Sequence, residues 1–194
     1  MDEIQAVVID AGDPEEALIQ TVHLLRGTII TQFAHVEFMF ADLFFRALRQ
    51  PEYRSLPATM PYRVKERIAR VKQLATMDGP IRAYEPELLQ VADGLVEFEN
   101  LRQYMAHGNM TVEFDADPPA VFFQVYDKPK GSGPVLRIMR TGCADLGEQS
   151  IRVGLYANEV ITLFYRIFTE IPLEPTASFW TANQAPAVMQ PTPS

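Results

Sequence analysis

The chain has 194 residues, of which 47% are hydrophobic and 22% are charged, enough to bury the core of one compact domain and too few for two ordinary domains. Cys143 is the only cysteine, which excludes an internal disulfide and a zinc site built from several thiolates. The first residues lack the basic start and the apolar run of a secretory signal. We therefore expect a cytoplasmic protein in a reducing compartment.

The charge is unevenly distributed along the chain. The net charge of −8 repels polyanions at long range, and the total gives no indication of DNA binding. Between Arg46 and Lys72, however, eight basic residues accompany two acidic ones, a local charge of +6 that leaves −14 for the rest. The most apolar stretch, residues 29–48, contains charged side chains such as Asp42, which are costly in hydrocarbon. We expect a buried helix there and no membrane span.

The segment Asp13 to Glu16 predicts the start of a long helix. Aspartate caps free backbone amides, proline fits the first helical position, and glutamate favours the positive end of the helix dipole. Apolar residues then recur at steps of three and four, which predicts one buried stripe. Its members are Leu18, Val22, Leu25, Ile29, Phe33, Val36, Phe40 and Leu43. A second apolar set between Ile30 and Phe45 requires partners on two sides, one of which could belong to a second subunit.

Three prolines in residues 50–61 predict a connection with little regular structure. A second helix is expected from Pro61 to Met77. Its inward-facing residues are expected to be Val64, Ile68, Val71 and Ala75. On the opposite side, Arg63, Arg67 and Arg70 form a basic stripe that we expect to be exposed. This stripe is either a solvated face or a surface that contacts RNA phosphates.

The second half of the chain alternates between helical and strand-like patterns. A third helix is expected over residues 86–107, because its apolar residues keep the helical spacing up to Gly108. Residues 111–115, 121–126 and 134–140 are short, rich in β-branched and aromatic residues, and separated by turn sequences, which predicts three antiparallel strands. A fourth helix is expected over residues 145–169.

The predicted fold class is mainly α, a four- to five-helix up-and-down bundle with a small antiparallel β meander inserted before the last helix. The meander occupies about residues 111–140, and residues 1–171 are assigned to a single domain. Residues 172–194 are rich in proline and small polar residues, which predicts a disordered tail. Its aromatic pair, Phe179 and Trp180, could dock on the domain or on a partner.

One motif at the end of the third predicted helix points to a specific chemistry. Arg102 and His107 are separated by four residues. Five helical positions correspond to roughly 140° of rotation, so an ideal helix would not stack the two side chains. We expect the helix end to fray beside Gly108, which would let the imidazole share a cleft with the guanidinium. A neutral histidine can then take the proton from a ribose 2′-hydroxyl while the arginine offsets charge on the phosphate oxygens.

The segment Leu101 to Gly108 resembles the hallmark of the HEPN superfamily, an arginine, four to six residues and a histidine near the end of a helix in an all-helical bundle. The resemblance covers about Leu18 to Thr169 in layout. It implies a homodimer that brings two such motifs into one cleft and cleaves RNA without a metal, leaving a cyclic phosphate. It also implies a toxin or defence effector that pairs with an antitoxin protein.

Two features depart from the family pattern. Gln103 stands where the family usually has asparagine or another small polar residue, and a β meander interrupts the bundle before its last helix. Gln103, inside the motif, and Asn109, just after it, are candidate contacts to RNA phosphates, with Arg102 and His107 as the candidate catalytic pair.

Other interpretations stay open. His107 can cap the carboxyl end of its helix, and Arg102 can pair with Glu97 or Glu99. The chain would then be a catalytically inactive helical dimer that binds a protein partner or a nucleotide, or a scaffold that uses its aromatic tail. The sequence has no Glu-x-x-His pairing, phosphate loop or paired thiolates, so no metal site and no cofactor are expected.

Overall fold

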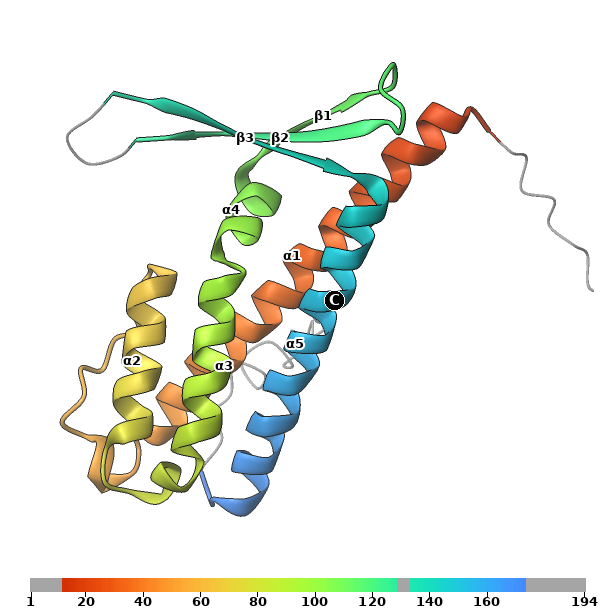
Figure 1. Cartoon of the computed structure of the whole chain (residues 1–194). Helices are drawn as coiled ribbons and strands as arrows, with labels where there is room; N and C mark the ends of the chain where they lie inside the picture. Colours follow the sequence, from red (N-terminus) through yellow and green to blue (C-terminus); the bar gives the residue numbers. More distant parts are fainter. Residues whose placement is uncertain (1–11, 129–132, 174–194) are drawn as a thin grey trace, which may run out of the picture. The chain divides into compact units, whose positions relative to one another are not determined.

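The computed structural model describes residues 12–128 and 133–173 (Figure 1). Within these ranges it contains five α-helices and one sheet of three antiparallel strands, which lies between the fourth and fifth helices in the chain. The helices are α1 (Pro14–Ala47), α2 (Val64–Thr76), α3 (Glu85–Glu97), α4 (Glu99–His107) and α5 (Cys143–Glu170). The strands are β1 (Asn109–Glu113), β2 (Ala120–Asp127) and β3 (Val135–Gly142). The predicted fold class, mainly helical with a β meander before the last helix, is confirmed.

The chain forms two compact units, which are described separately below. The first holds the described residues of 1–34 and 98–155, and the second holds those of 35–97 and 156–194. The assignment of residues 1–171 to a single domain stays a prediction.

Helix α1 begins where the sequence predicts. Pro14 is its first residue, and the Glu15 backbone amide donates to the Asp13 carboxylate at 3.0 Å. The buried stripe is confirmed at six positions that are at most 2% exposed, namely Val22, Ile29, Phe33, Val36, Phe40 and Leu43. Phe38, from the second apolar set, is 61% exposed, so the described residues do not cover that set fully.

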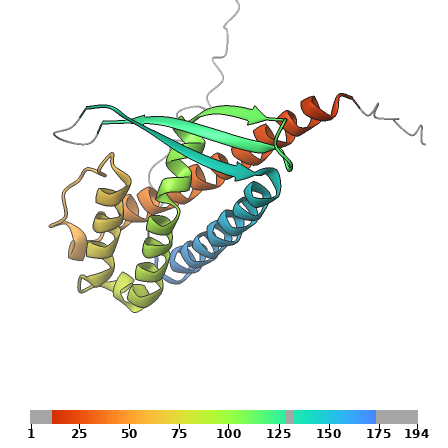
Figure 2. The same cartoon turned by 45° about the horizontal axis from the view of Figure 1, so that its top comes forward.

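The sheet belongs to the first unit, with strand order β1-β2-β3 and both pairs antiparallel. Figure 2 shows the three strands side by side as one twisted layer. Along β2, Val121, Phe123 and Val125 are buried, whereas Tyr126 is exposed, as expected for side chains that alternate between two faces. Residues opposite each other share a face, so the register divides all three strands into an inner face, buried along β2 and mostly half-buried along β1 and β3, and a more exposed outer face.

The helix predicted over residues 86–107 is interrupted at Phe98, where α3 and α4 meet. Phe98 has φ −90° and ψ 0°, outside the usual α-helical values. Its buried ring lies 6.2 Å from the ring of Phe33, and the Arg152 guanidinium lies 5.5 Å from its centroid. The prediction of one uninterrupted helix is therefore wrong. Hydrophobic periodicity reports which positions are buried and does not report the backbone change that accompanies the packing of one large ring.

In the second unit, α2 has the buried residues that the sequence predicts: Val64, Ile68, Val71 and Ala75. The connection before it contains one short 3₁₀ helix, η1 (Pro51–Tyr53). The prediction that Arg63, Arg67 and Arg70 form one exposed stripe is wrong. The Arg63 side chain is 83% exposed, but the Arg67 side chain is only 23% exposed.

Arg67 is held by partners on two sides. Its guanidinium lies 3.0 Å from the Glu37 carboxylate and donates to the Pro61 carbonyl oxygen at 2.7 Å. Arg70 is half-buried and donates to the Gln73 side chain at 3.1 Å. The helical spacing keeps the three residues on one side of the helix, but it contains no information on the partners of Arg67, Glu37 and Pro61, which lie outside α2.

A close approach between α3 and α5 organises the second unit further. Gly94 leaves room for the Tyr156 ring, since a Cβ atom at this position would lie 2.7 Å from a ring carbon. The Tyr156 hydroxyl donates to the Val91 carbonyl oxygen at 2.7 Å. Burial, with a smaller contribution from Glu159, raises the pKa of Tyr156 well above its usual value of 10.0. The ring and its hydroxyl therefore join the two helices in the neutral form.

The raised pKa of Tyr156 predicts a loss of stability at alkaline pH. Below pH 10 both states keep the phenol proton; above it, the unfolded chain loses the proton and the folded chain keeps it. The free energy of unfolding should then fall by about 1.4 kcal/mol per pH unit for this group. Denaturant titrations between pH 8 and 11 should show a shallower fall for Tyr156→Phe than for the natural chain. Tyr165→Phe, at an exposed position of α5, is the control, and parallel curves for all three proteins would contradict the assignment.

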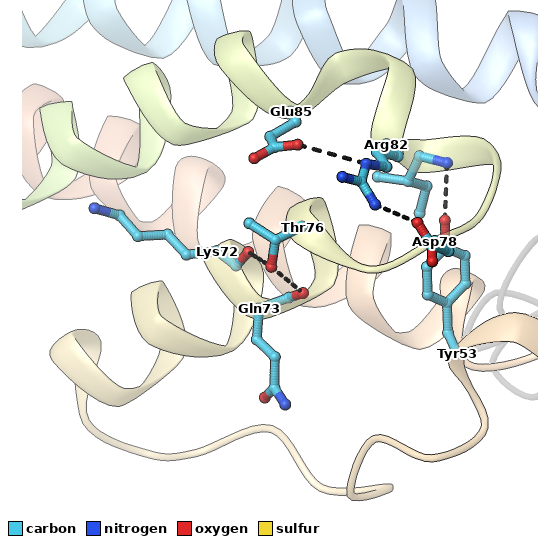
Figure 3. A network of polar contacts seen from close by, with 8 residues as sticks. Tyr53, Lys72, Gln73, Thr76, Asp78, Arg82 and Glu85 are labelled. Atoms are coloured by element: carbon cyan, nitrogen blue, oxygen red, sulfur yellow. Dashed lines mark hydrogen bonds and ion pairs between the residues drawn. The ribbon is translucent and has the colours of Figure 1, made fainter.

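A second structural tyrosine fixes the turn before η2 (Pro80–Tyr84). Tyr53 is fully buried, and its hydroxyl oxygen accepts a hydrogen bond from the Ile81 backbone amide at 2.8 Å. Figure 3 shows Tyr53 beside Asp78 and Arg82, which form an ion pair across this turn. Gly79 lies between these elements with φ +157°, a conformation that side chains rarely adopt.

Two further predictions from the sequence concern a membrane span and the tail. No helix in residues 12–128 and 133–173 combines the length and the apolar character that a bilayer crossing needs. Of the predicted tail, only Pro172 and Leu173 lie within the described residues, and Leu173 is buried. Phe179 and Trp180 lie outside the described residues.

Candidate functional site

The candidate pair, Arg102 and His107, lies on α4 in the first unit. The backbone amide of Gly108 donates to the Tyr104 carbonyl oxygen at 2.8 Å, so the helical ladder continues through His107. The prediction of a frayed helix end is therefore wrong. In a regular helix the two residues are separated by about 140° around the axis and roughly 7.5 Å along it. The positions of one copy consequently point to different sides of α4.

The two candidate groups differ in their surroundings. His107 is exposed, and within the described residues its imidazole has no hydrogen-bond partner. Arg102 is half-buried, and its backbone amide continues the helix by donating to Phe98 at 2.9 Å. An exposed imidazole can exchange protons with a bound substrate, and a half-buried guanidinium is held in a more fixed position.

Arg26 of α1 is a site residue that the sequence interpretation missed. Its Nε donates to the Met105 carbonyl oxygen at 2.7 Å, and a terminal nitrogen donates to the Gly108 carbonyl oxygen at 2.9 Å. Its guanidinium also lies 5.8 Å from the centroid of the Phe123 ring. One cation thus satisfies two carbonyl groups at the carboxyl end of α4, where the helix dipole favours positive charge. No local sequence signal could reveal it, because Arg26 is 79 residues from Met105.

Two further arginines reach α4 or its start. Arg137 of β3 donates to the Asn100 side chain at 3.3 Å and lies 5.6 Å from the centroid of the Tyr104 ring. Arg152 of α5 lies over the ring of Phe98, as described above. With Arg102 and Arg26, four guanidinium groups from four elements gather along one nine-residue helix. Arg137 also pairs with the Asp127 carboxylate at 3.5 Å, so its charge is partly offset, and the group adds only a local excess of positive charge to an acidic chain.

Gly108 is required by a close approach and not by an unusual backbone angle. Its φ is −72°, which any residue adopts. A Cβ atom here would clash with the Tyr104 carbonyl oxygen and would lie 3.1 Å from the Phe123 Cβ atom. The glycine after His107 thus lets β2 pack against the end of α4, which is a structural role that the motif alone did not indicate.

The remaining candidate residues are divided between the units. Gln103 is half-buried on α4, and Asn109 is exposed as the first residue of β1, so both stay near the motif in the chain and in the first unit. Arg63 immediately precedes α2, Arg67 and Arg70 lie on it, and all three belong to the second unit.

Other sites carry less chemistry. Across the described ranges, no group of three or more histidine, cysteine, aspartate or glutamate side chains is placed to hold a metal ion. A cleft between α3 and α5 is lined by Glu87, Gln90, Glu159 and Arg166, among others. Its polar groups bond to each other, Gln90 to Glu159 at 2.8 Å and Arg166 to Glu87. The surroundings of α4 are therefore the best candidate site in the described chain.

No family model, no curated protein and no solved structure matches the chain.

Proposed function

We propose that this protein is a metal-independent endoribonuclease of HEPN type that acts as a homodimer, with His107 as the proton-transfer group and Arg102 as the phosphate-stabilising group. One observation carries the proposal: an exposed imidazole stands at the end of a helix along which four arginines gather. The identification with HEPN proteins rests on the resemblance of the motif around Arg102 and His107.

The proposed reaction uses the 2′-hydroxyl of RNA as the nucleophile. His107 takes the hydroxyl proton, the 2′-oxygen attacks the adjacent phosphorus, and the bond from phosphorus to the 5′-oxygen breaks. The leaving 5′-oxygen receives a proton from a second imidazole. Arg102 offsets the negative charge that grows on the non-bridging oxygens. The products are a 2′,3′-cyclic phosphate and a 5′-hydroxyl.

A second copy of the chain is part of the proposal for a geometric reason. Arg102 and His107 of one copy lie about 140° apart on a regular helix, so one phosphate does not face both within a single copy. A two-fold axis close to α4 would place the arginine of one copy beside the histidine of the other, and it would supply the second imidazole. The proposed partners are accordingly a second copy, RNA and, by resemblance, an antitoxin protein.

The test is cleavage of a mixed-sequence single-stranded RNA in the presence of EDTA. The natural chain should yield fragments that end in cyclic phosphate, and His107→Ala should lower the rate by about 10²-fold or more, the usual contribution of a proton-transfer group. His23→Ala and His35→Ala remove other exposed histidines, on α1, and should leave the rate unchanged. Fragments that persist in His107→Ala at the natural rate would refute the assignment.

A second candidate function is a catalytically inactive dimer that binds a protein partner. Three large apolar side chains of the first unit favour it: Leu24 is 70% exposed, Ile151 is 65% exposed and Leu155 is 68% exposed. Ile151 and Leu155 are four residues apart on α5 and share one helix face, and contiguous exposed apolar side chains often mark surfaces that bind other proteins. Intact RNA in the same assay, together with a dimer mass by light scattering, would favour this candidate over the nuclease.

A further inference from the structure

The outer face of the sheet is more exposed than the inner face, and it carries aromatic and hydrogen-bonding side chains. We define it by six residues: Asn109, Phe122, Gln124, Tyr126, Ile138 and Arg140. The register places Gln124 opposite both Asn109 and Ile138, and Phe122 opposite Arg140. Tyr126 is 76% exposed, and Ile138 is 52% exposed. The same sheet buries Val121 and Phe123 on its inner face. The exposed side chains of the outer face therefore do not contribute to this core.

Three of these groups have the chemistry that holds unpaired nucleobases. The Arg140 guanidinium lies 5.8 Å from the centroid of the Phe122 ring, which forms a flat cationic surface at one end of the face. Tyr126 lies four residues further along β2, roughly 13 Å away at the rise of a strand. Aromatic rings and guanidinium planes stack on bases of any sequence. The amides of Gln124 and Asn109, between the two ends, can bond to base edges.

We propose that the outer sheet face binds single-stranded RNA by base stacking and that this RNA is the substrate presented to His107. The inference rests on the proposed nuclease function and adds its substrate class. Asn109 follows His107 by two residues, so their Cα atoms are at most about 7 Å apart. A strand stacked on the outer face would therefore have its backbone close to the imidazole.

The charge of the protein decides between stacking and phosphate binding as the main source of affinity. The chain carries a net charge of −8, and on the outer side of the strands Arg140 is offset by Glu113. Counterion release from phosphates therefore contributes little, and the affinity should depend weakly on salt. A duplex hides its bases from stacking, so double-stranded RNA should bind much more weakly.

Binding can be measured separately from cleavage with a fluorescent 12-nucleotide RNA that carries 2′-O-methyl groups, because the blocked 2′-oxygen cannot attack the phosphorus. Tyr126→Ala should weaken binding by about 5-fold or more in fluorescence anisotropy, the lower bound for one stacked base. Tyr126→Trp should retain it. Tyr165→Ala removes an equally exposed tyrosine, 74%, from α5 in the other unit and should leave binding unchanged.

The outcomes separate this inference from the nuclease proposal. Unchanged binding by Tyr126→Ala, or equal binding of a matched duplex, would overturn the stacking surface, even if His107→Ala abolishes cleavage. Weaker binding by Tyr126→Ala supports the surface, even if no RNA is ever cleaved. If Tyr126→Ala instead changes the mass of the oligomer measured by light scattering and leaves RNA binding unchanged, the face is a protein-docking surface and the inference is overturned.

Discussion

Replacing Gly79 by alanine is expected to lower the free energy of unfolding by about 3 kcal/mol. Gly79 has φ +157°, and a Cβ atom there would lie 2.5 Å from the Tyr53 hydroxyl oxygen and 2.7 Å from the ring carbon that carries it. Tyr53 cannot move away cheaply, because its ring is fully buried and its hydroxyl accepts the Ile81 amide at 2.8 Å. Backbone strain and the clash with Tyr53 therefore both lower the free energy of unfolding of Gly79→Ala. Denaturant unfolding of the purified chain measures the change.

Two further variants make this prediction specific. Gly27→Ala lies inside α1, where a Cβ atom would meet nothing within 4 Å, so it should raise the free energy of unfolding by about 0.5 to 1 kcal/mol. Tyr53→Phe removes the hydroxyl that the alanine would strike. In that background, Gly79→Ala should cost less than it does in the natural chain. Equal costs in the two backgrounds would show that the clash with the hydroxyl does not contribute.

The second large effect is expected for Arg26→Met, which should lower the free energy of unfolding by about 3 kcal/mol. Methionine keeps an apolar stem of similar length, but the carbonyl oxygens of Met105 and Gly108 lose their donors at 2.7 and 2.9 Å. Hydrogen bonds from a charged group contribute about 1.5 to 3 kcal/mol each. The stability of Arg26→Lys should lie between that of the natural chain and that of Arg26→Met, because one ammonium group cannot reproduce the two-pronged geometry of a guanidinium.

The role of Arg26 can be distinguished from that of an exposed surface arginine by locating the amides that lose protection in the variant. Hydrogen exchange of the amides around His107 should become faster in Arg26→Met, while the amides of α2 should keep their protection. Arg63→Met provides the control, since the Arg63 side chain is 83% exposed and its nearest carboxylate oxygen, on Glu66, is 3.7 Å away. That variant should change stability by less than about 0.5 kcal/mol. Similar losses in both variants would argue against the role assigned to Arg26.

The candidate site could be predicted from the sequence only in part. The motif spacing correctly placed Arg102 and His107 near the end of a helix. The frayed end was wrong, because the Gly108 amide completes the helical ladder and the packing of Phe123 against Gly108 holds the chain in place. The sequence also gave no reason to associate Arg26, Arg137 and Arg152 with this helix. Each comes from a distant segment, and a spacing pattern contains no information on such contacts.

The outer sheet face shows a similar division. The β-branched and aromatic residues of 121–126 predicted a strand, and the structure confirms it within β2. Which residues of the other strands share the exposed side with Tyr126 depends on register. A shift of one residue would turn every side chain to the opposite face, so the row formed by Asn109, Gln124 and Ile138 became visible only with the pairing of all three strands.

The sequence by itself determined the helices, the strands and most of the buried positions. These follow from local rules, because the helical period, runs of β-branched and aromatic residues, and the residues that start or stop an element act within a few positions. Only the tertiary structure decided the interruption at Phe98, the burial of Arg67 and the arginines around α4. These depend on the packing of large side chains and on polar groups that find partners far away in the chain, which local patterns do not encode.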